Sequence, residues 1–135
     1  MQTHLKNWNK SLADFVYTII NKITKKENIS VHYDVKTIED NKSYTDGDSI
    51  YLAHYDNLEY MLISFFHEYA HCRLRDKIPF AISNKHWNNT TTMQYEIQIT
   101  MAGINFAKEQ DIIFSDEAVK WILNQNFSYE EPEYI

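Results

Sequence analysis

Two histidines four residues apart, with a glutamate directly after the first, constrain this chain more than any other feature. The segment is His67-Glu68-Tyr69-Ala70-His71. On an α-helix, positions i and i+4 share a face, so His67 and His71 can both bind one metal ion. Glu68 then lies beside the position of a metal-bound water. The segment therefore predicts a helix that carries the core of a zinc-dependent hydrolase.

The sequence around the motif indicates where its helix begins and ends. Asp56 or Asn57 suits the N-cap position, and the apolar residues that follow continue directly into His67. Pro79 ends the helix, because the residue before a proline avoids the α region and the proline ring removes an N–H donor. We therefore expect the motif in the middle of a helix.

The residues ahead of that helix have the alternating pattern of a small sheet. Apolar and polar residues alternate from 29 to 35, which predicts a half-buried strand. Asp46-Gly47 separates two further strand-like segments, at residues 43–45 and 49–52. This is the pattern of a tight hairpin whose turn needs a positive φ. We expect a small antiparallel sheet.

Three further segments have the apolar spacing of helices. From Leu5 to Ile23, apolar residues recur every three or four positions, which predicts an amphipathic helix of about six turns. The same spacing predicts a helix from Met93 to Gln110. Ser115 suits the N-cap of a last, short helix that ends near Asn126. The predicted fold class is α+β, with an N-terminal helix, a small sheet, the motif helix and two further helices.

Length and charge exclude several classes of protein. A chain of 135 residues, 44% hydrophobic and 24% charged, fits a single globular domain spanning residues 1–135. A net charge of −6 argues against direct contact with nucleic acid. The single cysteine, Cys72, excludes an internal disulfide and suits a reducing compartment. We see neither a secretion signal nor an apolar run near the roughly 18 residues that span a membrane, so we expect a cytoplasmic protein.

The third metal ligand lies outside the motif, since a catalytic zinc site usually has three protein ligands and one open position. The extended pattern H-E-x-x-H-x-x-G-x-x-H is absent, because this chain has Leu74 and Lys77 in place of its glycine and its last histidine. Two candidates remain downstream, a glutamate on the next predicted helix and a histidine in the loop before it.

Glu96 is the favoured third ligand. It lies on the apolar face of its predicted helix, where a carboxylate must be paired or bound to a metal. His86, in the loop, is the alternative ligand. If Glu96 has a purely structural role instead, its expected partner is Arg73 or Arg75.

Together these segments resemble the ImmA/IrrE family of small zinc metallopeptidases. The resemblance covers most of the chain, from the N-terminal helix through the sheet and the motif helix to the helix that carries Glu96. It implies a zincin-like fold, with His67, His71 and Glu96 as zinc ligands and Glu68 as general base. It also implies that the substrate is a protein, a helix-turn-helix repressor encoded nearby.

Other residues are candidates for contact with the substrate. Tyr95, His86 or His54 could donate a hydrogen bond to a developing oxyanion. An extended substrate could add to the edge of the sheet, with Ile50, Tyr51 and Leu52 in the receiving strand. Cys72 is rotated by about 100° from the ligand face of the helix, so we interpret it as a small buried apolar residue rather than a ligand.

Two other functions compete with this hypothesis. In a SprT-like zincin, His86 would bind the zinc and Glu96 would form an ion pair. In a protein-binding module, the zinc would be structural and catalysis lost. Glu68 argues against the module, because a carboxylate that neither binds metal nor packs has little structural reason to lie beside the ion.

Overall fold

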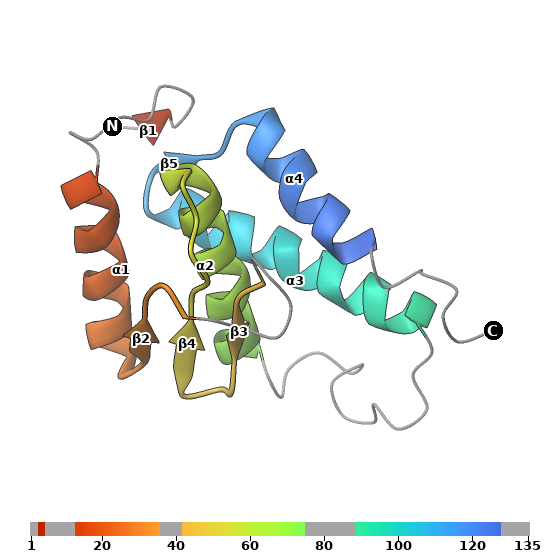
Figure 1. The fold of residues 1–135 in the computed structure, drawn as a ribbon, viewed down its shortest axis with the longest axis horizontal. Helices are drawn as coiled ribbons and strands as arrows, with labels where there is room; N and C mark the ends of the chain where they lie inside the picture. The colour runs from red at the N-terminus through yellow and green to blue at the C-terminus, as the bar shows by residue number, and fades with distance from the viewer. Residues whose placement is uncertain (1–2, 5–12, 36–41, 75–88, 128–135) are drawn as a thin grey trace.

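Four helices and five short strands make up the part of the chain that the computed structural model describes, residues 3–4, 13–35, 42–74 and 89–127 (Figure 1). In chain order they are β1 (Thr3–His4), α1 (Ala13–Glu27), β2 (Ser30–His32), β3 (Tyr44–Thr45), β4 (Ser49–Tyr51), α2 (Leu58–Leu74), α3 (Asn89–Glu109), β5 (Ile112–Ile113) and α4 (Asp116–Phe127). The predicted α+β class is confirmed. No helix in these described ranges is long and apolar enough to span a membrane.

The helix that carries the motif is the centre of the fold. In Figure 1, α2 has α1 on one side and α3 and α4 on the other. Every residue from Met61 to Ala70 is buried, so this helix has no solvent-facing stripe along three turns. A helix buried all round is held by packing on every face. The motif histidines therefore start from a rigid backbone.

The predicted N-cap of α2 is confirmed, and Asn57 is the residue that provides it. Its side-chain oxygen accepts hydrogen bonds from the backbone N–H groups of Glu59, at 2.8 Å, and Tyr60, at 3.2 Å. These bonds satisfy two of the donors that a helix start leaves without a partner. The predicted end of this helix at Pro79 lies outside the described residues.

A glycine allows α3 to lie close against α2. A Cβ atom on Gly103 would lie 2.6 Å from the carbonyl oxygen of Phe66, which is too close for any other residue without a backbone shift. Phe66 directly precedes the first motif histidine. The close approach therefore fixes the distance between the motif and the side chains of α3. The helix α3 begins at Asn89, four residues before its predicted start at Met93.

The sheet differs from the one expected. Its strand order is β2-β4-β3, with β3 antiparallel to β4 and β2 parallel to it, so the prediction of a purely antiparallel sheet is wrong. Alternation of residues identifies a strand but neither its direction nor its neighbours, and here β4 lies between β2 and β3 although it follows both in the sequence. The hairpin itself is confirmed, with Gly47 at φ 101°.

The position of β4 also corrects the proposed substrate edge. β4 lies between two strands, and Leu52 just after it donates its N–H to the carbonyl of His32. Ile50, Tyr51 and Leu52 are therefore in the interior of the sheet and cannot receive a further strand. A second small sheet, the parallel pair β1 and β5, was not predicted, because each of its strands has only two residues.

The first and last helices match their predictions where they are described. α1 ends at Glu27, and Asn28 after it has a φ of 57°; its predicted first residues lie outside the described part. The hydroxyl of Ser115 caps α4 by accepting a hydrogen bond from the N–H of Ala118, at 3.2 Å. Ser115 also donates two bonds to the buried carboxylate of Glu59, which ties α4 to the first turn of α2.

Candidate metal centre

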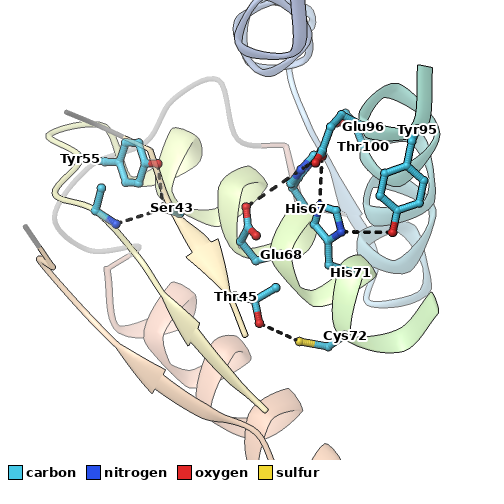
Figure 2. A network of polar contacts seen from close by, with 11 residues as sticks. Ser43, Thr45, Tyr55, His67, Glu68, His71, Cys72, Tyr95, Glu96 and Thr100 are labelled. Carbon is cyan, nitrogen blue, oxygen red and sulfur yellow. Dashed lines mark hydrogen bonds and ion pairs between the residues drawn. The ribbon is translucent and has the colours of Figure 1, made fainter. Parts of the chain in front are cut away.

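Three side chains from two helices converge on one point. His67 and His71 extend from α2 and Glu96 from α3, and each offers one ligand atom within 4.8 Å of the others. One oxygen of Glu96, Oε2, lies 2.8 Å from Nε2 of His67 and 3.0 Å from Nε2 of His71 (Figure 2). The structure therefore brings the favoured third residue to the two histidines of the motif.

The donor set fits zinc. Two imidazole nitrogens and one carboxylate oxygen form a common catalytic zinc set, with ligand distances of about 2.0–2.2 Å, which places tetrahedral donors roughly 3.4 Å apart. The two separations from Glu96, 2.8 and 3.0 Å, are shorter than this value, so Glu96 would move slightly away from the histidines to share an ion with them. All three side chains are mostly buried, so the charged carboxylate needs a cation beside it. The group could therefore hold a metal ion.

The electrostatics show how strongly this carboxylate is held. Burial opposes ionisation of Glu96, but its hydrogen bonds with His67 and His71 outweigh burial and lower its pKa to about 2. Burial disfavours the charged imidazole of His71, yet the bond with Glu96 prevails and raises the pKa of His71 overall. A metal ion at this position would take over the interaction with Glu96 and compete with protonation of His71.

Thr100 is a residue of the site that the sequence analysis missed. Its hydroxyl lies 2.8 Å from Nδ1 of His67, and its side chain is 1% exposed. A proton on Nδ1 can be donated to this hydroxyl, and Nε2 would then be free to bind a metal ion in place of its hydrogen bond with Glu96. Thr100 follows Glu96 by one helical turn, and this i, i+4 spacing was the signal in the sequence.

Tyr95 has a supporting position beside the second histidine. Its hydroxyl lies 3.5 Å from Nδ1 of His71, the nitrogen that does not face Glu96 (Figure 2). Tyr95 is buried and is not among the residues that line the cleft. It therefore contacts a metal-ligand candidate from behind, and the expected role as an oxyanion donor does not fit this position.

The next oxyanion candidate, His54, does not lie at the site. His54 is exposed, and its two ring nitrogens lie 2.8 Å from Asp34 and 2.9 Å from Asp56. It is absent from the cleft, so the prediction for His54 is wrong. His54 lies in the loop between β4 and the Asn57 cap of α2, where it bridges the carboxylates of Asp34 and Asp56. His86 lies outside the described residues.

Glu68 lies beside the metal group without joining it. Its Oε2 is 4.0 Å from Nε2 of His67, which is beyond the distance of the Glu96 contacts. The side chain is buried, and burial raises its pKa despite the opposing charges of His67 and His71. A carboxylate with a raised pKa that borders a metal site has the chemistry of a general base.

These side chains border a cleft of about 290 Å³. Its floor is α2, which contributes four residues on one face: Ser64, His67, Glu68 and His71. One wall comes from residues 42–45, which include β3, and the other from α4. The volume is near the lower end of ligand sites, about 300–1,000 Å³.

Two neighbours of the motif have structural roles. Cys72 is partly buried with its sulfur 3.3 Å from the hydroxyl of Thr45, and it is not part of the metal group, as predicted. Arg73 donates to the hydroxyl of Tyr69, at 2.9 Å, and pairs with Glu27, at 3.8 Å. Arg73 is thus engaged away from Glu96, while Arg75 lies outside the described residues.

Comparison with protein-family models, with curated proteins and with solved structures finds no match for this chain. The fold and the geometry of the site are therefore the basis for its function. They give an α+β chain with a buried His-His-Glu group that could hold a metal ion, and a second buried glutamate beside it.

Proposed function

We propose that this protein is a zinc-dependent metallopeptidase of zincin-like fold, with His67, His71 and Glu96 as zinc ligands. The main observation in support is the convergence of these three donors at a cleft, with an uncoordinated carboxylate 4.0 Å from one of them. A purely structural metal site usually has four protein ligands and no such neighbour. The resemblance of the motif and its flanking segments to the ImmA/IrrE family also supports the proposal.

The chemistry is divided between the metal and the chain. When bound, zinc would bring the pKa of a coordinated water toward about 7 and polarise a carbonyl group. Thr100 and Tyr95 hold the rings of the two histidines from behind. Glu68 accepts the proton of the attacking water and passes it to the leaving amine, because it borders the metal group without joining it.

We propose that the substrate is a protein segment in extended conformation that pairs with β3. This strand forms one wall of the cleft through Tyr44 and Thr45. Within the described residues, β3 pairs with β4 along one edge and its other edge has no strand beside it. A peptide can add to such an edge by main-chain hydrogen bonds. The resemblance suggests a helix-turn-helix repressor as the source of that segment.

Metal content and one conservative variant test the proposal together. We expect about one zinc per chain after dialysis, measured by elemental analysis. Glu68→Gln should keep the zinc and the fold but reduce cleavage of the repressor encoded nearby at least about a hundredfold, because the amide cannot accept a proton. Glu109→Gln, on the exposed end of α3, is the control and should behave like the wild type.

The outcomes separate the competing functions. Full activity in Glu68→Gln would mean that the protein acts by binding a partner protein and not by cleaving it. Glu96→Gln should weaken zinc binding strongly, whereas His86→Ala should leave the metal bound. The reverse pattern would favour the SprT-like alternative, and a chain without zinc in every preparation would refute the metal centre.

A further inference from the structure

Three aromatic rings lie in a row across the three-stranded sheet. His32 of β2 and Tyr44 of β3 are each aligned with Tyr51 of β4 in the strand register. The three side chains therefore share one face of the sheet, opposite to the face of the buried residue Ile50. His32 and Tyr44 are exposed among the described residues. We call these three side chains the aromatic row.

The spacing of the aromatic row is that of the strands themselves. The ring of Tyr51 is stacked between the other two, with centroids 4.8 Å from His32 and 4.6 Å from Tyr44. The ring planes are inclined by only 8° and 13°. Neighbouring strands lie about 4.7–4.9 Å apart, so each ring lies over its own strand and parallel to the next ring. A strand added to the sheet would therefore place a side chain at the next position of the row.

The aromatic row ends at the edge strand where we propose that the substrate pairs. Tyr44 has Tyr51 on one ring face, and its other ring face is directed toward the edge of β3 that has no strand beside it within the described residues (Figure 1). The side chain of Tyr44 is 46% exposed, and this residue also lines the cleft. A peptide that pairs with β3 would thus place one residue directly against the open face of this ring.

The turn after β3 provides a carboxylate beside the aromatic row. The hydroxyl of Tyr51 donates to Oδ2 of Asp46, at 3.3 Å, which places this carboxylate on the face of the row. Its Oδ1 accepts the backbone N–H groups of Asp48 and Ser49, at 3.0 and 2.9 Å, and these bonds lower the pKa of Asp46. All three donors are neutral, so they do not compensate the negative charge. An exposed ring beside an ionised carboxylate favours a planar cation.

We propose that the substrate residue opposite Tyr44 is an arginine. This inference rests on the proposed peptidase function and on pairing of the peptide with β3. The guanidinium group extends the aromatic row by stacking on the open face of Tyr44, and its N–H groups donate to Oδ2 of Asp46. An aromatic side chain would stack but leave the carboxylate without a cation, and an aliphatic one would do neither. The net charge of −6 also favours the approach of a basic segment.

Binding of zinc-directed probes tests this selection without a turnover assay. The zinc-loaded protein is titrated by calorimetry with acetohydroxamate, which reports on the metal centre alone. It is then titrated with alanine-rich peptides that carry a hydroxamate at one or the other end, and arginine, tryptophan or leucine is placed at each position in turn. At one position we expect arginine to bind about fivefold more tightly than leucine, the combined scale of an exposed cation–π contact and an exposed ion pair.

Two variants assign the preference to the ring and to the carboxylate. Tyr44→Thr removes the ring but suits a strand, and Asp46→Asn removes the charge but keeps a side-chain oxygen for the turn. Each variant should reduce the preference for arginine to about twofold or less without changing the affinity for acetohydroxamate. Tyr44→Phe, which keeps the ring, and Asp14→Asn, which removes a charge at an exposed position of α1, should keep the fivefold preference.

The outcomes distinguish this inference from the function on which it rests. If arginine is preferred at no position, or if the preference is unchanged in either Tyr44→Thr or Asp46→Asn, the arginine site is overturned alone. Tighter binding of tryptophan than of arginine would also overturn it, because an aromatic side chain would then extend the row. A protein that binds neither zinc nor acetohydroxamate would overturn the peptidase function and this inference together.

Discussion

Replacement of Thr100 by valine tests how the site prepares a histidine for a metal. The two side chains have nearly the same shape, but valine lacks the hydroxyl that lies 2.8 Å from Nδ1 of His67. Binding of a metal at Nε2 places the proton of His67 on Nδ1. In the variant, this buried N–H loses its acceptor, at a cost of about 1–3 kcal/mol. Because about 1.4 kcal/mol corresponds to a factor of ten, zinc affinity should fall roughly 5- to 150-fold.

Competition with a chromogenic chelator at pH 7 would measure this loss. Tyr95→Phe provides an internal comparison, because its hydroxyl lies 3.5 Å from His71 and a bond of that length is weak. We expect a loss of about threefold or less for that variant. Thr18→Val, at an exposed position of α1, should leave zinc affinity unchanged.

The result that refutes the reasoning is specific. If Thr100→Val binds zinc within about twofold of the wild type, the hydroxyl does not orient His67. A larger loss of zinc affinity in Tyr95→Phe than in Thr100→Val would mean that the distance from hydroxyl to Nδ1 does not predict how strongly each residue orients its histidine. Thermal unfolding of the metal-free variants separates either result from a general loss of stability.

Three further predictions concern the scaffold. Glu59→Gln should reduce the free energy of unfolding by about 1–3 kcal/mol in urea titrations, because the buried carboxylate accepts two bonds from Ser115. Gly103→Ala should cost about 1–3 kcal/mol by the same measurement and also weaken zinc binding, because its Cβ would lie 2.6 Å from the oxygen of Phe66. Hydrogen bonds with two carboxylates raise the pKa of His54 above 6.5, so its contribution to stability is complete below pH 6.5 and is lost as pH rises through the raised pKa. His54→Gln should flatten the fall in stability over that interval.

Local chemistry made part of this fold predictable from the sequence. The Asp46-Gly47 turn, the Asn57 cap and the Ser115 cap each depend on backbone conformations or hydrogen bonds within a few residues. The same is true of the two histidines, whose spacing on a helix places them on one face. Glu96 was predictable for a different reason, since a carboxylate on an apolar helix face needs a partner.

Contacts between distant segments were not predictable in the same way. The direction of β2 relative to β4 depends on the path of the chain between them. The contact of Thr100 with His67 joins two helices across 33 positions, and the i, i+4 spacing of Thr100 from Glu96 does not show which group its hydroxyl contacts. The bonds from Ser115 to Glu59 span 56 positions. In each case the sequence shows the residue but not which remote group it meets.

The three ligand residues come from two helices, so a bound metal ion would link these helices to each other. His71 and Glu96 are 25 positions apart, so an ion shared by them closes a loop in the chain and links α3 to α2. Separation of the two helices then requires the ion to lose a ligand, which adds the metal-binding free energy to the cost of local opening. Amide hydrogen exchange along α3 should therefore slow as the metal concentration rises, whereas amides of α1 that exchange by local opening should be unaffected, because that opening breaks no metal ligand. The exchange rate of one helix would thus report the occupancy of the site.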